Sequence, residues 1–219
     1  MTLLDRLERR FGAWAIPQFS LFIVMANGLI YLLAQVRSDF LIRLLLDPEA
    51  IRHGEVWRIL TFLFIPPMMG PLWMVFWLML LYQFAQALEQ EWGEFRFCVF
   101  YAIGALATIV AALWIVGETL SNIPLNTTLF LAFAMLFPNY ELLLFFILPV
   151  KVKYLAALTW LALLWAFVTG GPVTRVAIAA SLVNYVLFFG SQIWETIKLK
   201  IEVYRARRRF RSPGSNGDT

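Results

Sequence analysis

Six long apolar stretches constrain the fold of this chain more than any motif in it. Crossing a hydrocarbon core about 30 Å thick takes roughly 20 apolar residues of helix. Hydrophobic residues make up 61% of the chain and charged residues only 15%, which is far from the composition of a soluble domain. The sequence therefore predicts an all-α integral membrane protein with six transmembrane helices. They run from Pro17 to Val36, Ile59 to Leu81 with a helical extension to Glu89, Phe97 to Val116, Asn126 to Leu148, Tyr154 to Thr169 and Val173 to Trp194.

The basic residues predict how these helices are oriented, because short loops rich in Lys and Arg remain in the cytoplasm. Six spans place both termini on one side, and that side holds 13 of the 18 Lys and Arg residues. We therefore expect both termini in the cytoplasm, with a membrane domain at 1–196 and a basic, partly disordered tail at 197–219. This asymmetry also accounts for the net charge of +4, so the charge does not call for a nucleic-acid partner.

The chain has a single cysteine, Cys98, and a single histidine, His53. One cysteine excludes an intrachain disulfide and a thiolate metal cluster, and we expect neither a metal nor a cofactor. Histidine is the usual general base for a serine nucleophile. His53 lies in the polar connector between the first two spans, so no histidine is expected at membrane depth.

The connector from Arg37 to Arg58 has features of a folded interfacial element. Apolar residues around Leu44 interleave with charged ones, a pattern typical of a segment lying in the membrane interface. Asp47 and Pro48 predict the start of a short helix, which Gly54 ends.

The dipeptide Trp57-Arg58 closes this connector. Tryptophan prefers the headgroup zone, and a guanidinium carries five donors that can bind several backbone carbonyls. We therefore predict that Trp57 and Arg58 anchor the connector, and that Thr61 bonds back to its own helix.

Three segments in a fixed order carry more specific patterns. They are Asp47-Pro48-Glu49 with His53-Gly54-Glu55-Val56-Trp57-Arg58; Leu88-Glu89 with Gly93, Arg96-Phe97 and Tyr101; and Phe137-Pro138-Asn139 with Pro149-Val150-Lys151-Val152-Lys153. Together they resemble the rhomboid family of intramembrane serine proteases and their inactive relatives. The resemblance implies a six-helix rhomboid-like bundle with an interfacial first loop, in a bacterial inner membrane. It also implies structural roles for a set of motif residues, namely Gly54, Trp57, Arg58, Glu89, Gly93 and Arg96.

The positions that the rhomboid family uses for catalysis hold other residues here. Counting back from Pro138 to the family's Gly-x-Ser-Gly pattern places Ile123 where the nucleophile would be. The histidine of the sixth helix falls at Ser181, with Asn184 as the next candidate. The second-helix His and Asn that resemble oxyanion donors fall at Trp73 and Trp77.

The resemblance therefore implies an inactive member, a pseudoprotease that binds transmembrane segments of client proteins within the lipid bilayer. Asn184, Trp73 and Trp77 are its candidate client contacts. One alternative is a rhomboid-type serine endopeptidase with a rearranged site, using Ser121 or Ser181 with His53. A transporter or channel is disfavoured, because few ionisable residues lie within the spans. The oligomeric state stays open.

Two polar positions outside these motifs carry expectations of their own. Asn126, between the third and fourth helices, is expected to be solvated. Glu141 is expected within the fourth helix, where a buried carboxylate would need Lys151 or Lys153 as its partner.

Overall fold

The computed structural model describes residues 8–10, 12, 15–144 and 148–210, and most of them are helical. The chain divides into two compact units, Met1–Tyr185 and Val186–Thr219. The first unit contains all the sites discussed below. The disorder expected at the end of the tail concerns residues outside those described.

Five of the described helices are long and apolar enough to cross a membrane. A further apolar helix, α7, has only 14 residues, which span about 21 Å, whereas the hydrocarbon core is about 30 Å thick. The prediction of a multi-pass α-helical membrane protein is therefore confirmed, with five candidate spans and one shorter apolar helix. The six are α2 (Phe19–Val36), α5 (Pro71–Trp92), α6 (Glu94–Val110) with the π-helical turn η4 (Ala111–Val116), α7 (Ile123–Leu136), α8 (Val152–Thr169) and the Pro172–Gly190 part of α9 (Pro172–Phe210).

The second span begins later than predicted. The expected helix from Ile59 is broken into a short helix α4 (Arg58–Thr61), a 3-10 turn η3 (Phe62–Phe64) and an extended stretch before α5 begins at Pro71. Pro66 and Pro67 explain the break, because proline lacks an N–H and disfavours helix in the residue before it. The rest of the connector consists of η2 (Ser38–Arg43) and α3 (Pro48–Arg52).

The fourth span ends earlier than predicted. Helix α7 stops at Leu136, next to Phe137, whose backbone is not helical because Pro138 follows it. The apolar residues that seemed to continue this helix form an antiparallel hairpin of β1 (Glu141–Leu144) and β2 (Leu148–Lys151). Glu141 is therefore exposed on a strand opposite Lys151, and its predicted place within the fourth helix is wrong.

The other spans differ from their predicted bounds only at the ends. Helix α6 begins at Glu94, three residues before Phe97, and α9 continues to Phe210, well past the predicted end at Trp194. Gly93 joins α5 to α6 with φ of 84°, a left-handed conformation that only glycine adopts readily.

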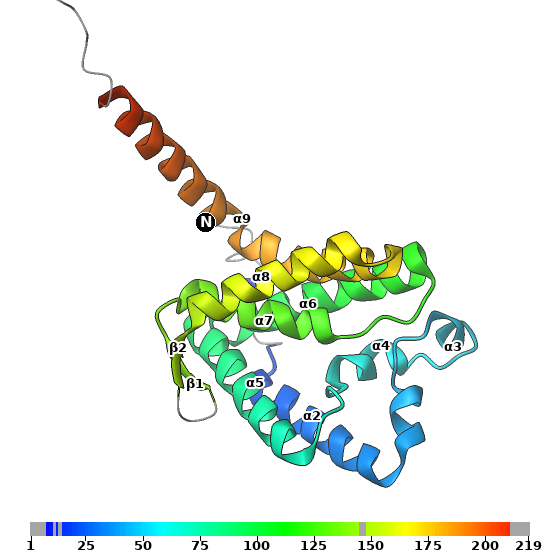
Figure 1. The fold of residues 1–219 in the computed structure, drawn as a ribbon. Coiled ribbons are helices and arrows are strands. Elements are labelled where there is room, and N and C mark those ends of the chain that lie inside the picture. The colour runs from blue at the N-terminus through cyan, green and yellow to red at the C-terminus, as the bar shows by residue number, and fades with distance from the viewer. Residues whose placement is uncertain (1–7, 11, 13–14, 145–147, 211–219) are drawn as a thin grey trace, which may run out of the picture. The chain divides into compact units, whose positions relative to one another are not determined.

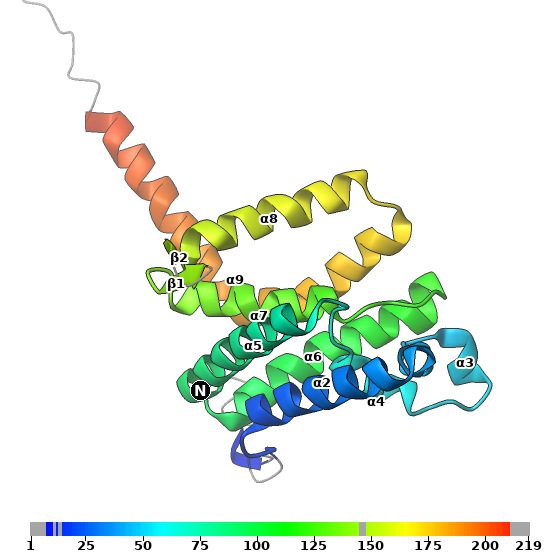
Figure 2. The same ribbon diagram turned by 60° about the horizontal axis from the view of Figure 1, so that its bottom comes forward.

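Helix α5 lies at the centre of the first unit, where it packs against α2, α6 and α7, and α7 also packs against α8. Figure 2 shows α5 and α7 side by side, with α8 beyond α7. The connector and the hairpin lie at opposite ends of the helices (Figure 1). These arrangements set up one cleft between α5 and α7 and one tightly packed junction on the other side of α7.

Candidate functional site

The start of α7 is fixed by the residue just before it. Asn122 is buried, and its Nδ2 donates to the carbonyl oxygens of Leu63 and Ile65, each at 3.0 Å. The Tyr101 hydroxyl donates to the same Leu63 oxygen at 3.1 Å. The first turn of α7 is thereby held against the extended stretch that leads into α5.

A cleft of about 320 Å³ lies between α5 and α7. Pro67 and, from α8, Thr159 also line it. Because Trp77 and Phe84 belong to the middle of the α5 span, the cleft lies at membrane depth. Its main walls come from Trp77, Leu80, Leu81 and Phe84 of α5 and from Ile123, Asn126, Thr127 and Phe130 of α7.

The polar side chains of the cleft differ in how well they are satisfied. The hydroxyls of Thr127 and Thr159 each donate at 2.9 Å to a carbonyl of their own helix, those of Ile123 and Leu155. The Asn126 Oδ1 atom is buried and has no hydrogen-bond partner among the described residues. Asn126 was expected at the start of the fourth span and solvated; it does lie in the first turns of α7, but its Oδ1 is buried, so the expected solvation of that atom is wrong.

Ile123, where the nucleophile was expected from the resemblance, lines this cleft. Ile123 is the first residue of α7 and is 58% exposed. An aliphatic side chain has no atom that can attack a carbonyl. The position therefore offers the cleft only apolar surface.

The three residues proposed for a rearranged dyad do not come together. Ser121 is exposed and its Oγ accepts from the Ile123 N–H at 3.2 Å. Ser181 is buried and donates to the Ile178 carbonyl at 2.9 Å. His53 is exposed at the end of α3. Within the described part of the chain, no hydrogen bond joins His53 to either serine.

The two tryptophans at the expected oxyanion positions lie in different surroundings. Trp77 is half-buried in the cleft wall. Trp73 is 52% exposed, and its ring lies 6.1 Å from that of Phe76. Of the two, only Trp77 is among the residues that line the cleft.

Asn184 lies on the opposite side of α7, in a junction of α6, α7 and α9. Its side chain is fully buried, and Nδ2 donates to Thr128 Oγ1 at 3.2 Å and to the Phe100 carbonyl at 3.4 Å. Its Oδ1 accepts from the Tyr185 N–H at 2.8 Å. Gly104 makes room for this amide, because a Cβ there would lie 2.7 Å from Asn184 Nδ2. The geometry is that of a packing contact between helices.

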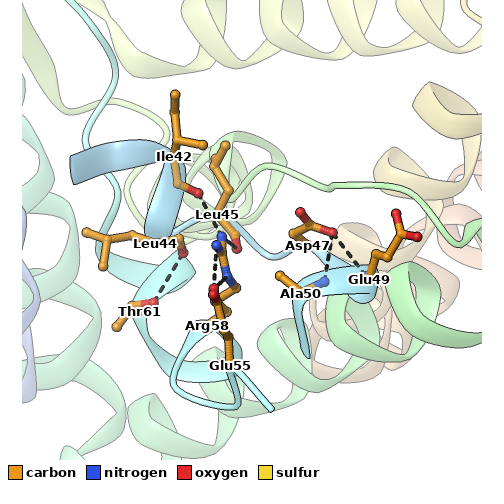
Figure 3. Close-up of polar contacts among 9 residues, drawn as sticks. All are labelled: Ile42, Leu44, Leu45, Asp47, Glu49, Ala50, Glu55, Arg58 and Thr61. Atoms are coloured by element: carbon orange, nitrogen blue, oxygen red, sulfur yellow. Dashed lines mark hydrogen bonds and ion pairs between the residues drawn. The ribbon is translucent and has the colours of Figure 1, made fainter. Parts of the chain in front are cut away.

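Arg58 binds backbone and side-chain oxygens from several parts of the connector (Figure 3). Its guanidinium is buried and donates to the carbonyls of Ile42 at 2.7 Å and Leu45 at 3.2 Å, and it pairs with Glu55 at 2.6 Å. Thr61 donates to the Leu44 carbonyl at 3.2 Å, so the expectation that it bonds to its own helix is wrong.

Polar contacts also hold the rest of the connector in place. Asp47 Oδ1 accepts from the N–H groups of Glu49 at 3.0 Å and Ala50 at 3.4 Å, and so caps α3 (Figure 3). Gly54 follows that helix with a positive φ of 103°. Trp57 is 52% exposed at the start of α4. A backbone bridge between Leu46 and Leu120 ties the connector to the loop before α7.

Glu89 has a capping role that the sequence did not reveal. Its buried carboxylate accepts from the N–H groups of Phe19 at 2.7 Å and Ser20 at 3.3 Å, and from the Ser20 hydroxyl. It thus satisfies donors at the start of α2, where negative charge is favoured. Nearby, Arg96 pairs with Glu8 at 3.0 Å. In the sequence, only Ser20 near the start of the first span could have indicated that this helix start needs a polar partner.

Among the described residues, no group of three or more His, Cys, Asp and Glu side chains is placed to hold a metal ion. The candidate site is the α5–α7 cleft, whose lining is mostly apolar and includes the Asn126 and Thr127 side chains.

Comparison with known proteins assigns the chain at the level of its family. No curated protein matches the sequence. The family described as "Eukaryotic integral membrane protein (DUF1751)" matches residues 18–197, which is most of the chain and every membrane helix. That description is eukaryotic, so the expected bacterial inner membrane has no support from it. The chain belongs to this family of eukaryotic integral membrane proteins.

Proposed function

We propose that this protein is a rhomboid-like pseudoprotease that binds transmembrane segments of client proteins. One observation carries the proposal. A cleft at membrane depth is lined by Ile123 and Trp77, the two positions where the rhomboid resemblance implies a nucleophile and an oxyanion donor. The binding cleft of such a protein would thus be kept while its chemistry is lost.

The absence of a nucleophile with its base supports the non-catalytic half of the proposal. A serine needs a base within hydrogen-bond reach, and neither Ser121 nor Ser181 meets His53 in the described structure. In serine hydrolases, the loss of one oxyanion donor alone raises the barrier by about 2.7 to 4 kcal/mol. In the described part of the chain neither serine is bonded to the histidine, which favours binding over cleavage of a peptide bond.

The short helix α7 supports the binding half. At about 21 Å it is shorter than the hydrocarbon core, so the bilayer must thin or polar groups must approach its ends. A locally thinned bilayer lowers the free energy needed to hold a polar client segment beside the cleft. The well-bonded connector around Arg58 would keep the other helices in place while the client docks.

The proposal includes an arrangement in the membrane. We propose a rhomboid-like bundle of six helices at 1–196, a basic tail at 197–219, and both termini in the cytoplasm. The 13-of-18 share of basic residues on that side supports it. Epitope tags at either terminus should be reachable only from the cytoplasmic side; a tag detected on the other side would require a different number of membrane crossings.

Proteolysis is tested directly with purified protein in lipid. The protein should leave rhomboid model substrates intact and should not react with a fluorophosphonate probe. Cleavage that disappears in both Ser121→Ala and His53→Ala would replace the pseudoprotease with a serine endopeptidase that has a rearranged site. Cleavage that survives both substitutions would instead identify a contaminating protease.

Client binding is tested in cells by placing a photo-crosslinking residue at Ile123, inside the cleft, and at Trp114 as a matched control. Both side chains are exposed, but Trp114 lies in η4, outside the residues that line the cleft. We expect membrane proteins to be captured from position 123 and not from position 114. Equal capture at both positions would contradict the assignment of the cleft.

A further inference from the structure

We propose that a second, polar cleft of this protein binds the headgroup of phosphatidylethanolamine, and that Glu94 accepts hydrogen bonds from its ammonium group. The cleft lies between α2, α5 and the start of α6, and its volume is about 410 Å³, a size typical of small-molecule sites. It shares no lining residue with the α5–α7 cleft. The inference therefore does not depend on client binding.

The polar cleft lies where three membrane helices end. Helices α2 and α6 begin, and α5 ends, at residues that line it or adjoin it, and all three are long and apolar enough to cross a membrane. Lipid headgroups lie at the ends of such spans. Tyr82, Gln86 and Gln90 of α5 line the cleft at intervals of four residues, so they form one stripe about 12 Å long that runs from the headgroup zone into the membrane.

The charge of the polar cleft favours a cation. Glu89 and Glu94 line it, whereas no Lys, Arg or His among the described residues does. Arg96 follows Glu94 by two residues, but it pairs with Glu8 at 3.0 Å. Because like charges repel, an anionic headgroup such as that of phosphatidylglycerol is disfavoured.

The two carboxylates have different roles. Glu89 is buried and accepts hydrogen bonds from Phe19 and Ser20, so it adds negative charge to the wall while it caps α2. Glu94 is exposed, and its side chain makes no hydrogen bond or ion pair with the described residues. Its two oxygens are therefore free to accept from an ammonium group, which carries three donors.

The other polar side chains supply donors for the rest of the headgroup. Gln18, Tyr82, Gln86 and Gln90 all line the cleft, and their side chains make no hydrogen bond within the described part of the chain. Amide and phenol groups can donate to phosphate and ester oxygens without adding positive charge. Acceptors for an ammonium group thus lie beside donors for a phosphate, which is the pattern that a zwitterionic headgroup requires.

The lining also distinguishes ethanolamine from choline. Choline carries three methyl groups in place of N–H donors, so it cannot donate to Glu94. Proteins usually bind such a cation through a cage of aromatic rings. Among the described lining residues Tyr82 is the single aromatic one, so the cleft favours the primary ammonium.

The test uses the full-length protein in mild detergent with equal amounts of phosphatidylethanolamine, phosphatidylcholine and phosphatidylglycerol that carry the same acyl chains. Native mass spectrometry identifies the lipid that stays bound. We expect about 5- to 30-fold more phosphatidylethanolamine than either of the others. An even distribution would overturn the proposal. Free phosphoethanolamine at the same concentration should not displace the lipid, since it lacks the part that follows the stripe; full displacement would replace the lipid by a soluble ligand.

The variants locate the preference. Glu94→Gln should bring the three lipids to within about 2-fold of one another, and Glu94→Lys should shift the preference to phosphatidylglycerol. Glu91→Gln is the matched control, because Glu91 is also exposed near the end of α5 but does not line the cleft, and it should bind lipids as the wild type does.

A second variant keeps the test decisive if the Glu94 variants do not fold. Gln90→Leu changes an exposed residue of the same cleft and should lower the amount of bound phosphatidylethanolamine several-fold by removing a donor. Wild-type binding of this lipid in both Glu94→Gln and Gln90→Leu would overturn the site. An equal loss in Glu91→Gln and Glu94→Gln would also overturn it, because the effect would then come from surface charge in general.

Discussion

The two faces of α7 carry asparagine sites of opposite character. On one face, Thr128 meets Asn184 in a junction where each polar atom of the Asn184 amide has a partner. On the other, Asn126 lines a cleft with an unpaired Oδ1. The two α7 residues are only two positions apart, which is about 200° around a helix. The same helix therefore carries a fully bonded packing contact on one face and an incompletely bonded amide beside a cleft on the other.

This difference separates a polar group whose hydrogen bonds are complete from one whose hydrogen bonds are not. A buried amide whose bonds are complete fixes the helices it joins, and changing it affects stability. A buried amide with an unpaired atom lowers stability, because that atom has lost its hydrogen bonds to water without gaining another. The connector belongs with the first kind, because Arg58, Thr61 and Asp47 all have their donors or acceptors engaged.

The largest effect on stability is expected from Arg58→Ala in the connector. Hydrogen bonds to charged groups contribute about 1.5 to 3 kcal/mol each, and the variant leaves the Ile42 and Leu45 carbonyls without this donor. We expect a loss of about 3 kcal/mol in the free energy of unfolding, measured by denaturant titration in mild detergent. His53→Ala is the control, because His53 is also in the connector but exposed, and its free energy of unfolding should be nearly that of the wild type. Equal midpoints for Arg58→Ala and the wild type would remove the anchor role.

The next largest effect is expected from Gly104→Ala in the junction. The new Cβ would lie 2.4 Å from Leu125 Cδ1 and 2.7 Å from Asn184 Nδ2. Overpacking of this kind lowers stability by about 1 to 3 kcal/mol, and the same titration should detect it. Gly190→Ala is the matched control, because a Cβ at that helical glycine would meet its nearest atom only at 3.8 Å. Comparable losses in both variants would mean that helix flexibility, not the junction, is responsible.

The sequence predicted the connector better than it predicted the spans. Arg58 stood out because five donors at the end of a polar connector need nearby carbonyls, and those carbonyls lie in the same short segment. The second and fourth spans were misjudged because apolar residues alone do not define a helix. Pro66, Pro67 and Pro138 indicate breaks, but a hydropathy average does not respond to single prolines. The strands of the hairpin are as apolar as the helix before them, so hydropathy assigned them to that helix.

The cleft could not be found from sequence because it is made by helices far apart in the chain. Ile123 and Trp77 were selected through the family resemblance, and both line it. Trp73, selected on the same basis, does not. Asn126 was placed at the very start of the fourth span and expected to be solvated, although Pro124 two residues earlier is typical of a helix start. Only the packing of α5 against α7 shows that its Oδ1 is buried and unpaired.

A smaller loss of stability is expected from Asn184→Leu. The substitution keeps the approximate size of the side chain but removes its bonds to Thr128 and Phe100. Hydrogen bonds between membrane helices contribute about 0.6 to 2 kcal/mol, so the free energy of unfolding should fall by about that amount. Thr128→Val removes the hydroxyl that accepts from Asn184. The loss of unfolding free energy in the double variant should therefore be little more than in Asn184→Leu alone. Full additivity would show that the two side chains do not act together.

The smallest effect, and the one that separates the two faces most sharply, is expected from Asn126→Leu. This substitution removes an acceptor that has no partner and places an apolar side chain in an apolar wall. Unfolding should therefore require the same free energy or up to about 1 kcal/mol more, in the opposite direction to Asn184→Leu. Both variants replace an asparagine by leucine, so propensity and size are matched, and only the bonding state differs. If Asn126→Leu lost as much stability as Asn184→Leu, the Asn126 amide would have a structural partner, and the contrast between the two faces of α7 would disappear.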